Sequence, residues 1–369
     1  MPALLKSLQP DPLLLITMGD AAGIGPEIIA KAFALHPAEM QQCVVIGDVA
    51  TMRRAAALVA ASAAGGVPLL AVAQLENLKA AAAVPPRCIG VLQGCAAFAA
   101  PVPLGQISAA AGQAAADCIR WAAQAVLQGQ AHGMVTAPIH KEALAAAAKA
   151  QNFNEAYFPG HTEMLQAESA RHQGVAISEM PVRMMLANGE LKTVLVSIHL
   201  SLRAAIEAVT HESVLQTLRI THAALATADQ PKPRIGVAGL NPHAGEGGLF
   251  GQEETAFIAP AIATAQAEGI NALGPFAPDT VFMRARNTAE HRGEFDAVVA
   301  MYHDQGLIPV KYLGVEQGVN VTLGLPMVRT SPDHGTAFDI AGTGLADASS
   351  LLAAVRLARQ MCLKQAETD

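Results

Sequence analysis

The chain has 369 residues, of which 52% are hydrophobic and 15% charged, and its formal net charge is −7. This length and apolar content predict a globular protein with two domains of ordinary size or one large one. The absence of a long basic run argues against nucleic acid as a partner, so an anionic ligand must be held by a few local cations or helix N-termini.

The five cysteines are scattered along the chain and form no C-x-x-C pair. Their odd number and spacing argue against a disulfide framework or a thiolate zinc site, and they favour a reducing compartment. The first residues, MPALLKSLQPDP, carry one lysine and no long apolar core, so they do not resemble a signal peptide. We therefore expect a cytoplasmic protein.

The first predicted strand, residues 13–17, is followed by the glycine-rich turn TMGDAAGIGPE (17–27) and a helix from about Pro26. This turn lacks the G-x-G-x-x-G spacing of a dinucleotide fingerprint, and no G-K-[ST] follows that would make it a P-loop. Pro26 suits the first turn of a helix, and Glu27 is favourable near the positive end of the helix dipole. Two interpretations stay open: a tight turn that permits close packing, or a loop that lines a ligand-binding cleft.

Residues 55–73 carry no charge over 19 positions, which is long enough for a membrane span. The segment is mostly alanine, however, and Gly65, Gly66 and Pro68 interrupt it. We predict a helix, a turn and a short buried strand here, and no membrane span.

The remaining chain alternates short apolar runs with alanine-rich helical patterns. Further predicted strands are residues 43–48, 133–138, 182–187, 192–199, 234–240 and 295–303, and clear helical patterns cover residues 110–129 and 202–226. Strand followed by helix, repeated, predicts an α/β fold with a largely parallel sheet. The continuous apolar character of the strands indicates a sheet covered on both faces.

Three of the predicted strands are followed by a histidine: His199, His243 and His303. Because ligands bind beyond the carboxyl ends of parallel strands, these three side chains could face one cleft. Three imidazoles with open positions left over would suit Zn²⁺ or a similar divalent ion. Each histidine alone is more often a structural residue, so the metal hypothesis depends on the three together.

Several residues could hold an anion. His161 and Thr162 lie at a predicted helix start, where N–H groups and a hydroxyl suit a phosphate, although Thr162 could simply be an N-cap. Lys311, Asn320 and Arg329 follow within one stretch and would suit a phosphorylated, carboxylated substrate, although such cations are often surface charges. The glycine-rich loops 239–254 and 330–347 are long enough to be functional, and the first surrounds His243.

Eight segments of the chain, in this order, closely resemble the 4-hydroxythreonine-4-phosphate dehydrogenase family, the NAD-dependent enzymes of pyridoxal phosphate synthesis. They are GDAAGIGPEI, VTAPIHK, GHTE, SIHLSLR, GLNPHAGEGG, AMYHDQGLIPVK, GVNVTLGLP and RTSPDHGTAFDIAGTG. The resemblance runs from about Leu13 to the last predicted helix. One departure is Ala21, where the family's turn usually has a proline, and we expect it to matter little.

The resemblance implies an α/β fold of two domains, similar to that of isocitrate and isopropylmalate dehydrogenases, with mostly parallel sheets and a cleft between the domains. We expect residues 1–135 and 310–369 to form the cofactor-side domain. Residues 136–309 are expected to form the domain that binds metal and substrate and dimerises. The family also implies a homodimer whose active site is shared between the subunits.

The resemblance further implies which residues form the site. The ligands of one divalent metal ion (zinc, magnesium or cobalt) would be His199, His243 and His303. The contacts to a small phosphorylated substrate would be His161, Thr162, Lys311, Asn320 and Arg329.

In the related folds, a D-H-G-[ST]-A-x-D-I-A-G loop holds the adenosine half of NAD, which explains why no dinucleotide fingerprint is needed. Here this loop is residues 333–342. The expected contacts to NAD, or to NADP, are Asp333, His334, Gly335 and Asp339.

The implied reaction is the oxidation of 4-phosphooxy-L-threonine. The metal would hold the substrate hydroxyl and lower its pKa, a base would take the proton, and hydride would pass to the nicotinamide. The resulting β-keto acid would lose CO₂ to give 3-amino-2-oxopropyl phosphate. The base stays open between Lys141 and Asp304, and Asp304 could instead orient His303.

Three alternatives remain at this point. The nearest is a dehydrogenase of the same family that oxidises D-threonate or D-erythronate 4-phosphate, or a dihydrodiol from aromatic degradation. The residues above favour a phosphorylated substrate but do not separate an amino acid from a sugar acid. A metal-dependent hydrolase and a non-catalytic metal or phosphate carrier are the rivals from other classes.

Overall fold

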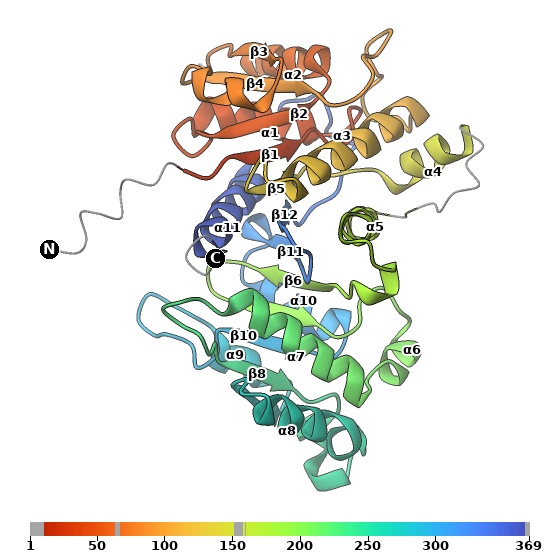
Figure 1. Cartoon of the computed structure of the whole chain (residues 1–369), viewed down its shortest axis with the longest axis vertical. Helices are drawn as coiled ribbons and strands as arrows, with labels where there is room; N and C mark the ends of the chain where they lie inside the picture. The colour runs from red at the N-terminus through yellow and green to blue at the C-terminus, as the bar shows by residue number, and fades with distance from the viewer. Residues whose placement is uncertain (1–10, 63–66, 151–157, 159, 366–369) are drawn as a thin grey trace, which may run out of the picture. The chain divides into compact units, whose positions relative to one another are not determined.

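A computed structural model describes residues 11–62, 67–150, 158 and 160–365 of the chain (Figure 1). The chain divides into two compact units: the first consists of Met1–Glu179 and Pro326–Leu363, and the second of Met180–Leu325 and Lys364–Asp369. The chain thus enters the second unit after Glu179 and leaves it after Leu325, both later than the expected boundaries at 135/136 and 309/310.

The first unit contains parallel strands in the order β3-β4-β2-β1-β5-β12. They are β1 (Leu14–Thr17), β2 (Cys43–Gly47), β3 (Ala71–Leu75), β4 (Cys88–Gln93), β5 (Gly133–Thr136) and β12 (Val328–Pro332). The central strands β1, β2 and β5 are buried along their whole length, as expected for a parallel sheet covered on both faces.

The short buried strand predicted within residues 55–73 is only partly confirmed. A strand forms, β3, but only one of its five residues is buried because it pairs with β4 alone. The turn predicted at Gly65–Gly66 lies outside the described residues. Of the described helices, none is both long and apolar enough to cross a membrane.

The helices of the first unit cover both faces of its sheet (Figure 1). They are α1 (Gly25–Leu35), α2 (Val49–Ser62), α3 (Ala109–Leu127), α4 (Lys141–Ala150), α5 (His161–Gln173) and α11 (Ser349–Gln365), with short turns of helix at η2 (Leu78–Ala83) and η3 (Ile177–Glu179). Helices α1 and α2 pack against each other, whereas α3 lies over β1, β2 and β5. The chain crosses the sheet from β1 to β2 in one direction and from β4 to β5 in the opposite direction, which places α3 on the face opposite α1, as right-handed crossovers require.

Small side chains let the helices of this unit approach closely. The buried face of α3 consists mainly of alanine, and a Cβ atom on Gly112 would lie 2.1 Å from the carbonyl oxygen of Ala143 in α4. Helices α4 and α5 both pack on α3, which keeps residues beyond position 135 in the first unit. The alanine bias of the sequence therefore serves helix packing as well as helix propensity.

The second unit has strands in the order β11-β6-β7-β10-β8-β9. They are β6 (Arg183–Ala187), β7 (Lys192–Leu195), β8 (Ile235–Ala238), β9 (Ala272–Phe276), β10 (Ala297–Ala300) and β11 (Val319–Leu323). Strand β6 is antiparallel to both β11 and β7, and the other pairs are parallel. The pairing of β11 with β6 explains why residues 310–325 belong to this unit.

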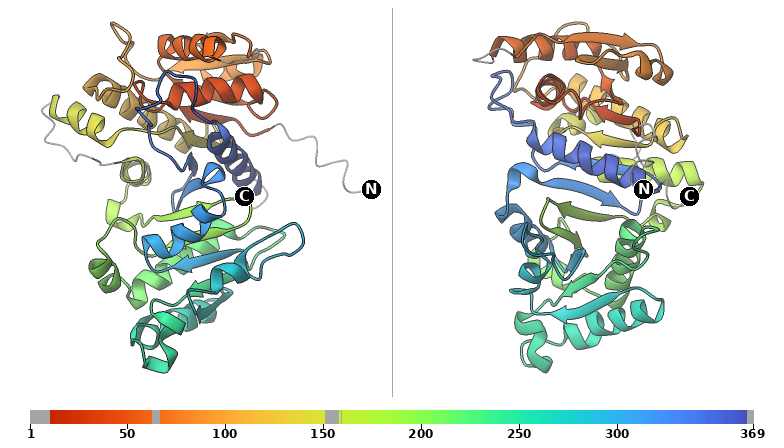
Figure 2. Two further views of the ribbon diagram at one scale, coloured as in Figure 1. Left: turned by 180° about the vertical axis from the view of Figure 1, so that it is seen from behind. Right: turned by 90° about the vertical axis from the view of Figure 1, so that its left-hand side faces the viewer.

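Helices again cover both faces of the sheet (Figure 2, right). They are α6 (Leu202–Glu207), α7 (His211–Leu225), α8 (Ala259–Ala267), α9 (Val281–Ala285) and α10 (His303–Tyr312), with shorter helical turns at η4 (Pro242–Gly248), η5 (Glu254–Ile258) and η6 (Val315–Gln317). Helices α7 and α8 pack together on one face, and α9 and α10 contact the strands on the other. The core beneath them contains Leu186, Leu195, Phe295, Val298 and Leu307.

The largely parallel α/β architecture predicted from the sequence is confirmed. Each strand predicted from an apolar run between residues 13 and 17 or beyond residue 130, and the one at 43–48, contains one observed strand. The strand predicted within residues 55–73 overlaps β3 in part, and β4, β9, β11 and β12 were not predicted as strands. The single helix expected over residues 202–226 is wrong. Thr210 ends it by forming a capping box with Ser213 that starts α7, so the segment becomes α6 and α7.

Candidate active site

The three strands that lead to the candidate metal ligands are neighbours. In the order β7-β10-β8, His199 follows β7, His303 follows β10 and His243 follows β8. From β8 the chain continues to β9 on one side, and from β10 it continues to β11 on the other. This reversal is the kind of switch point at which α/β sheets bind ligands beyond the carboxyl ends of their strands.

Side chains fix the ends of these strands relative to one another. Gln305 accepts a hydrogen bond from the amide of Met301 at 2.7 Å and donates one to the carbonyl of Gly239, also at 2.7 Å, so it joins β10 to β8. Ser197 donates to the carbonyl of Met301 at 3.0 Å and joins β7 to β10. The segments that carry the histidines therefore start from a rigid frame.

Two of the three imidazoles lie close together. The ring centroids of His199 and His303 are 5.9 Å apart. Nδ1 of His303 contacts a carboxylate oxygen of Asp304 at 2.7 Å, an arrangement in which Nδ1 donates and Nε2 keeps its lone pair for a metal. Within the described part of the chain, no three His, Cys, Asp or Glu side chains are placed to hold one ion, so the metal centre stays a prediction.

His243 lies on a loop of unusual conformation. His243, Ala244 and Glu246 have φ values of 51°, 53° and 43°, and Gly245 and Gly247 have 80° and 65°. A left-handed conformation costs a non-glycine residue roughly 1–2 kcal/mol. The loop is therefore a strained segment held by its surroundings, not the flexible surface loop that so much glycine could indicate.

An open groove lies at the switch point. Its lining includes Leu240, Pro242, His243, Tyr302, Asp304 and Gln305. Both the loop after β8 and the start of α10 thus contribute to one concave surface. Asp304 has 71% of its side chain exposed, so its carboxylate is accessible to a ligand.

The two residues of the second unit that were predicted to contact an anion lie on different elements. Lys311 is exposed in the last turn of α10, two turns after His303, which starts the same helix. Asn320 is half-buried in β11.

In the first unit, Arg329 of β12 is bound to Thr136 of β5. Its Nε and Nη2 atoms donate to the Thr136 hydroxyl at 3.1 and 2.7 Å, and only 5% of the residue is exposed. Burial lowers the pKa of Arg329 to about 10, although the Glu163 carboxylate opposes this effect. Arg329 therefore remains a buried cation at neutral pH.

His161 starts α5 beside this cation. Burial lowers the pKa of His161 well below its usual range, the charge of Arg329 lowers it further, and a hydrogen bond to the backbone of Ala137 opposes both. Its Nε2 atom is buried without a hydrogen-bond partner. Gly160 is the N-cap, so the alternative interpretation of Thr162 as the N-cap is wrong, and Thr162 lies in the first turn of the helix.

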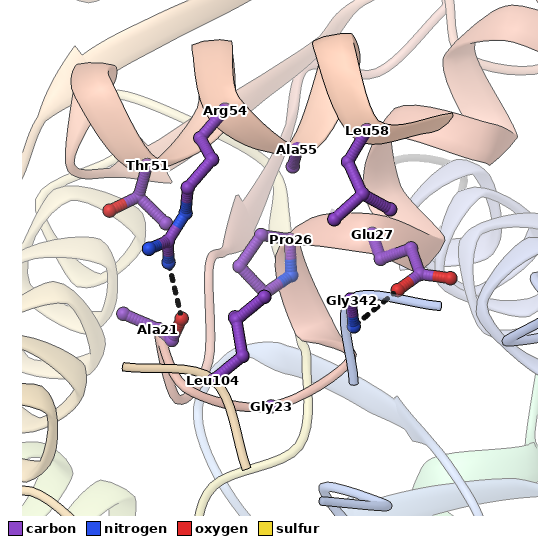
Figure 3. Close-up of a pocket in the computed structure, with 10 residues that line it drawn as sticks. All are labelled: Ala21, Gly23, Pro26, Glu27, Thr51, Arg54, Ala55, Leu58, Leu104 and Gly342. Carbon is purple, nitrogen blue, oxygen red and sulfur yellow. Dashed lines mark hydrogen bonds between the residues drawn. The ribbon is translucent and has the colours of Figure 1, made fainter. Parts of the chain in front are cut away.

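The glycine-rich turn after β1 holds the loop after β12. The amide of Ile24 donates to the carbonyl of Thr336 at 3.0 Å, and a Cβ atom on Gly23 would lie 2.9 Å from the same residue. The Glu27 carboxylate accepts from the amide of Gly342 at 3.2 Å (Figure 3). It also accepts from the amide of Ala346 at 3.3 Å. Close packing, one of the two interpretations of this turn, is therefore confirmed.

A small pocket lies between this turn, α1 and α2 (Figure 3). The Arg54 guanidinium spans it and donates to the carbonyls of Ala21 at 3.1 Å and Val102 at 2.7 Å. Ala21, the position where the family usually has proline, thus contributes its backbone. The pocket is a structural one, because its arginine is occupied by carbonyl groups.

The candidate cofactor loop is only partly buried. Asp333 and His334 are half-buried, whereas Gly335 and Asp339 are exposed. Nε2 of His334 is buried without a hydrogen-bond partner, which leaves a position for a ligand. Lys141, one of the candidate bases, is exposed at the start of α4.

The sequence did not single out Ser197, Gln305 or Thr136, although they lie within the quoted segments SIHLSLR, AMYHDQGLIPVK and VTAPIHK. The sequence carried no signal for their partners, which lie 104, 66 and 193 positions away.

A largely parallel α/β scaffold with histidines after its strands and a buried arginine in its sheet is that of an α/β enzyme. The family model for the pyridoxal phosphate biosynthetic protein PdxA matches residues 39–358. The chain therefore belongs to the PdxA family.

Individual relatives agree with this assignment. The chain is 51% identical to a 4-hydroxythreonine-4-phosphate dehydrogenase of Beijerinckia indica over 92% of its own length and 91% of the relative. It is 41% identical to a D-threonate 4-phosphate dehydrogenase of Salmonella typhimurium over 94% of its own length and 98% of the relative. The crystal structure of the 4-hydroxythreonine-4-phosphate dehydrogenase of Klebsiella pneumoniae is similar, with a TM-score of 0.81 and 38% sequence identity. The match covers 96% of this chain and 99% of that chain.

Proposed function

We propose that this protein is an NAD-dependent dehydrogenase that oxidises 4-phosphooxy-L-threonine, with loss of CO₂, to 3-amino-2-oxopropyl phosphate, a step of pyridoxal phosphate synthesis. The structural observation that carries the proposal is the placement of three histidine-bearing segments after the adjacent strands β7, β10 and β8. The 51% identity to an enzyme named for this substrate supports it over nearly the whole chain.

His199, His243 and His303 are the proposed ligands of one divalent ion, zinc, magnesium or cobalt. The contact between Asp304 and Nδ1 of His303 fits this role, because it orients the ring and fixes the tautomer that binds metal through Nε2. When bound, such an ion lowers the pKa of a substrate hydroxyl and polarises a neighbouring carbonyl.

The phosphate and carboxylate of the substrate are proposed to contact His161, Thr162, Lys311, Asn320 and Arg329. The buried Arg329 supports this role, since a guanidinium that stays charged inside the protein is suited to an anionic ligand. Nε2 of His161, buried and without a partner, supplies a second polar group beside it.

The adenosine half of NAD, or of NADP, is proposed to contact Asp333, His334, Gly335 and Asp339 in the first unit. The Glu27 contacts support this role, because they hold the following part of the loop at Gly342 and Ala346. The proton of the hydroxyl would pass to Lys141 or Asp304, both of which are exposed. A cytoplasmic homodimer with an active site shared between subunits completes the proposal.

A second candidate substrate is D-threonate 4-phosphate, because relatives named for it are 41% identical over 94% of the chain. This acid carries a hydroxyl group where 4-phosphooxy-L-threonine carries an amino group. The proposed contacts to phosphate and metal do not distinguish the two.

Formation of NADH from NAD, followed by its absorbance, tests both candidate substrates in one assay. With a divalent ion present, 4-phosphooxy-L-threonine should give NADH and CO₂ at a kcat/KM at least tenfold above that for D-threonate 4-phosphate. Activity on the sugar acid alone would reverse the choice. If substrate is hydrolysed without NADH formation, the protein is a metal-dependent hydrolase instead.

A further inference from the structure

The strained loop after β8 is held by one buried carboxylate. Glu254 has 3% of its surface exposed. One of its oxygens accepts from the amides of Leu240 and Asn241, both at 2.7 Å, and the other accepts from the Asn241 side-chain amide at 2.9 Å. These contacts fix the residues that directly precede Pro242 and His243.

The surrounding backbone is shaped around this carboxylate. A Cβ atom on Gly239 would lie 3.1 Å from one carboxylate oxygen, and a Cβ atom on Gly245 would lie 2.7 Å from the other. Glu254 also begins the π-helical turn Glu254–Ile258, an element that is rare and frequent at functional sites. The two glycines, one before and one after His243 in the sequence, therefore leave the space that the Glu254 carboxylate occupies.

We propose that Glu254 is a positioning residue that holds the left-handed loop 243–247 and thereby sets the direction of the His243 imidazole toward the metal. The inference rests on the proposed function in one respect, that His243 binds a divalent ion. Within the described ranges, the hydrogen bonds of Glu254 come from backbone and side-chain amides, so in this proposal it acts through His243 and not on the substrate.

The chemistry of the contacts defines the informative substitutions. All three groups that face Glu254 are N–H donors, so a carboxylate satisfies them and an amide cannot. Glu254→Gln keeps the shape but turns one acceptor into a donor that faces another donor. Glu254→Asp keeps the charge and shortens the side chain, so it should hold the loop in part.

Glu253 provides a matched control. It is the neighbouring glutamate and also accepts from the Asn241 side chain, at 2.7 Å, but it is bonded to neither backbone amide of the pair. Glu253→Gln should therefore leave the loop in place.

The experiment measures the affinity of the purified full-length chain for Co²⁺ by equilibrium dialysis and by its visible absorption spectrum. We expect Glu254→Gln to weaken binding by 10- to 100-fold, the usual effect of removing a group that orients a metal ligand. Glu253→Gln should change it less than threefold, Glu254→Asp should fall between them, and His243→Ala should abolish binding. Wild-type affinity in Glu254→Gln would overturn the inference.

Hydrogen exchange of peptide 239–252 gives a second readout that needs no metal. The Leu240 and Asn241 amides should exchange at least tenfold faster in Glu254→Gln than in the wild type or Glu253→Gln, and unchanged exchange would also overturn the inference. If Glu254→Gln does not fold, Glu254→Asp carries the same two measurements. If the wild type binds no metal but the exchange result holds, the proposed metal centre fails while the role of Glu254 in the loop stands.

Discussion

Arg329 and Thr136 are joined by two hydrogen bonds between parallel strands of the first unit, with the guanidinium donating from Nε and Nη2 to one hydroxyl. The arginine is buried, with only 5% of its surface exposed. Its charge lowers the pKa of His161, whose Nε2 atom is buried without a hydrogen-bond partner. This pair of groups is the best defined part of the candidate anion site.

Removal of the cation should weaken substrate binding. We expect Arg329→Met to raise the KM for the phosphorylated substrate on the order of 10- to 100-fold, because charged hydrogen bonds contribute roughly 1.5–3 kcal/mol. Thr136→Val keeps the shape of the partner and should have a smaller effect of the same sign. Steady-state kinetics at varied substrate concentration measure both, and an unchanged KM in Arg329→Met would exclude the arginine from the site.

His161 predicts a dependence of stability on pH. The pKa of His161 in the folded protein lies well below the usual histidine value of 6.5, so the unfolded chain takes up a proton first as pH falls. Between the pKa of His161 in the unfolded chain and its lower pKa in the folded protein, the free energy of unfolding therefore falls as pH falls. The slope from this one group is at most about 1.4 kcal/mol per pH unit. Urea unfolding of the wild type and of His161→Gln between about pH 5 and 7 should show a weaker pH dependence in the variant. Parallel pH dependences in the two proteins would contradict the lowered pKa.

Because Glu27 is hydrogen-bonded to the loop after β12, its substitution should weaken the binding of NAD and leave substrate binding nearly unchanged. Glu27→Gln should raise the KM for NAD by about three- to tenfold, because one amide of the loop then meets a donor instead of an acceptor. The KM for the phosphorylated substrate should stay within about twofold. Glu142→Gln, an exposed position in the first turn of α4, is the control. Equal changes in both KM values would mean that Glu27 has a general structural role.

Gln305 predicts a loss of stability in the second unit. Gln305→Leu removes the groups that bind the Met301 amide and the Gly239 carbonyl. Leaving these backbone groups without partners should lower the free energy of unfolding by about 1–3 kcal/mol. The exposed Gln317 offers the matched change Gln317→Leu, which should have little effect in the same urea titration. Equal stability of the two variants would show that the tie between β10 and β8 is unimportant.

The sequence predicted the fold class because periodicity and strand–helix alternation are local properties of the chain. The segments 133–138 and 295–303, for example, are apolar runs that contain β5 and β10. The same reasoning failed over residues 202–226, where the apolar pattern continues through a break that the capping box of Thr210 and Ser213 creates.

The candidate site was predictable only in part. His199, His243 and His303 could be selected because each follows an apolar strand, and the strand order confirms that these strands are neighbours. Glu254 could not be selected, because its role depends on a left-handed backbone at residues 243–247 that no local pattern specifies. Thr136 could not be paired with Arg329 before the register of β5 and β12 was known.

Anomalous diffraction at the metal absorption edge, from crystals of the protein loaded with Zn²⁺ or Co²⁺, tests the central claim most directly. The account predicts one strong peak per active site, about 2.0–2.1 Å from a ring nitrogen of each of His199, His243 and His303. A peak bound to other side chains, or no peak near these three rings in metal-loaded crystals, would contradict it.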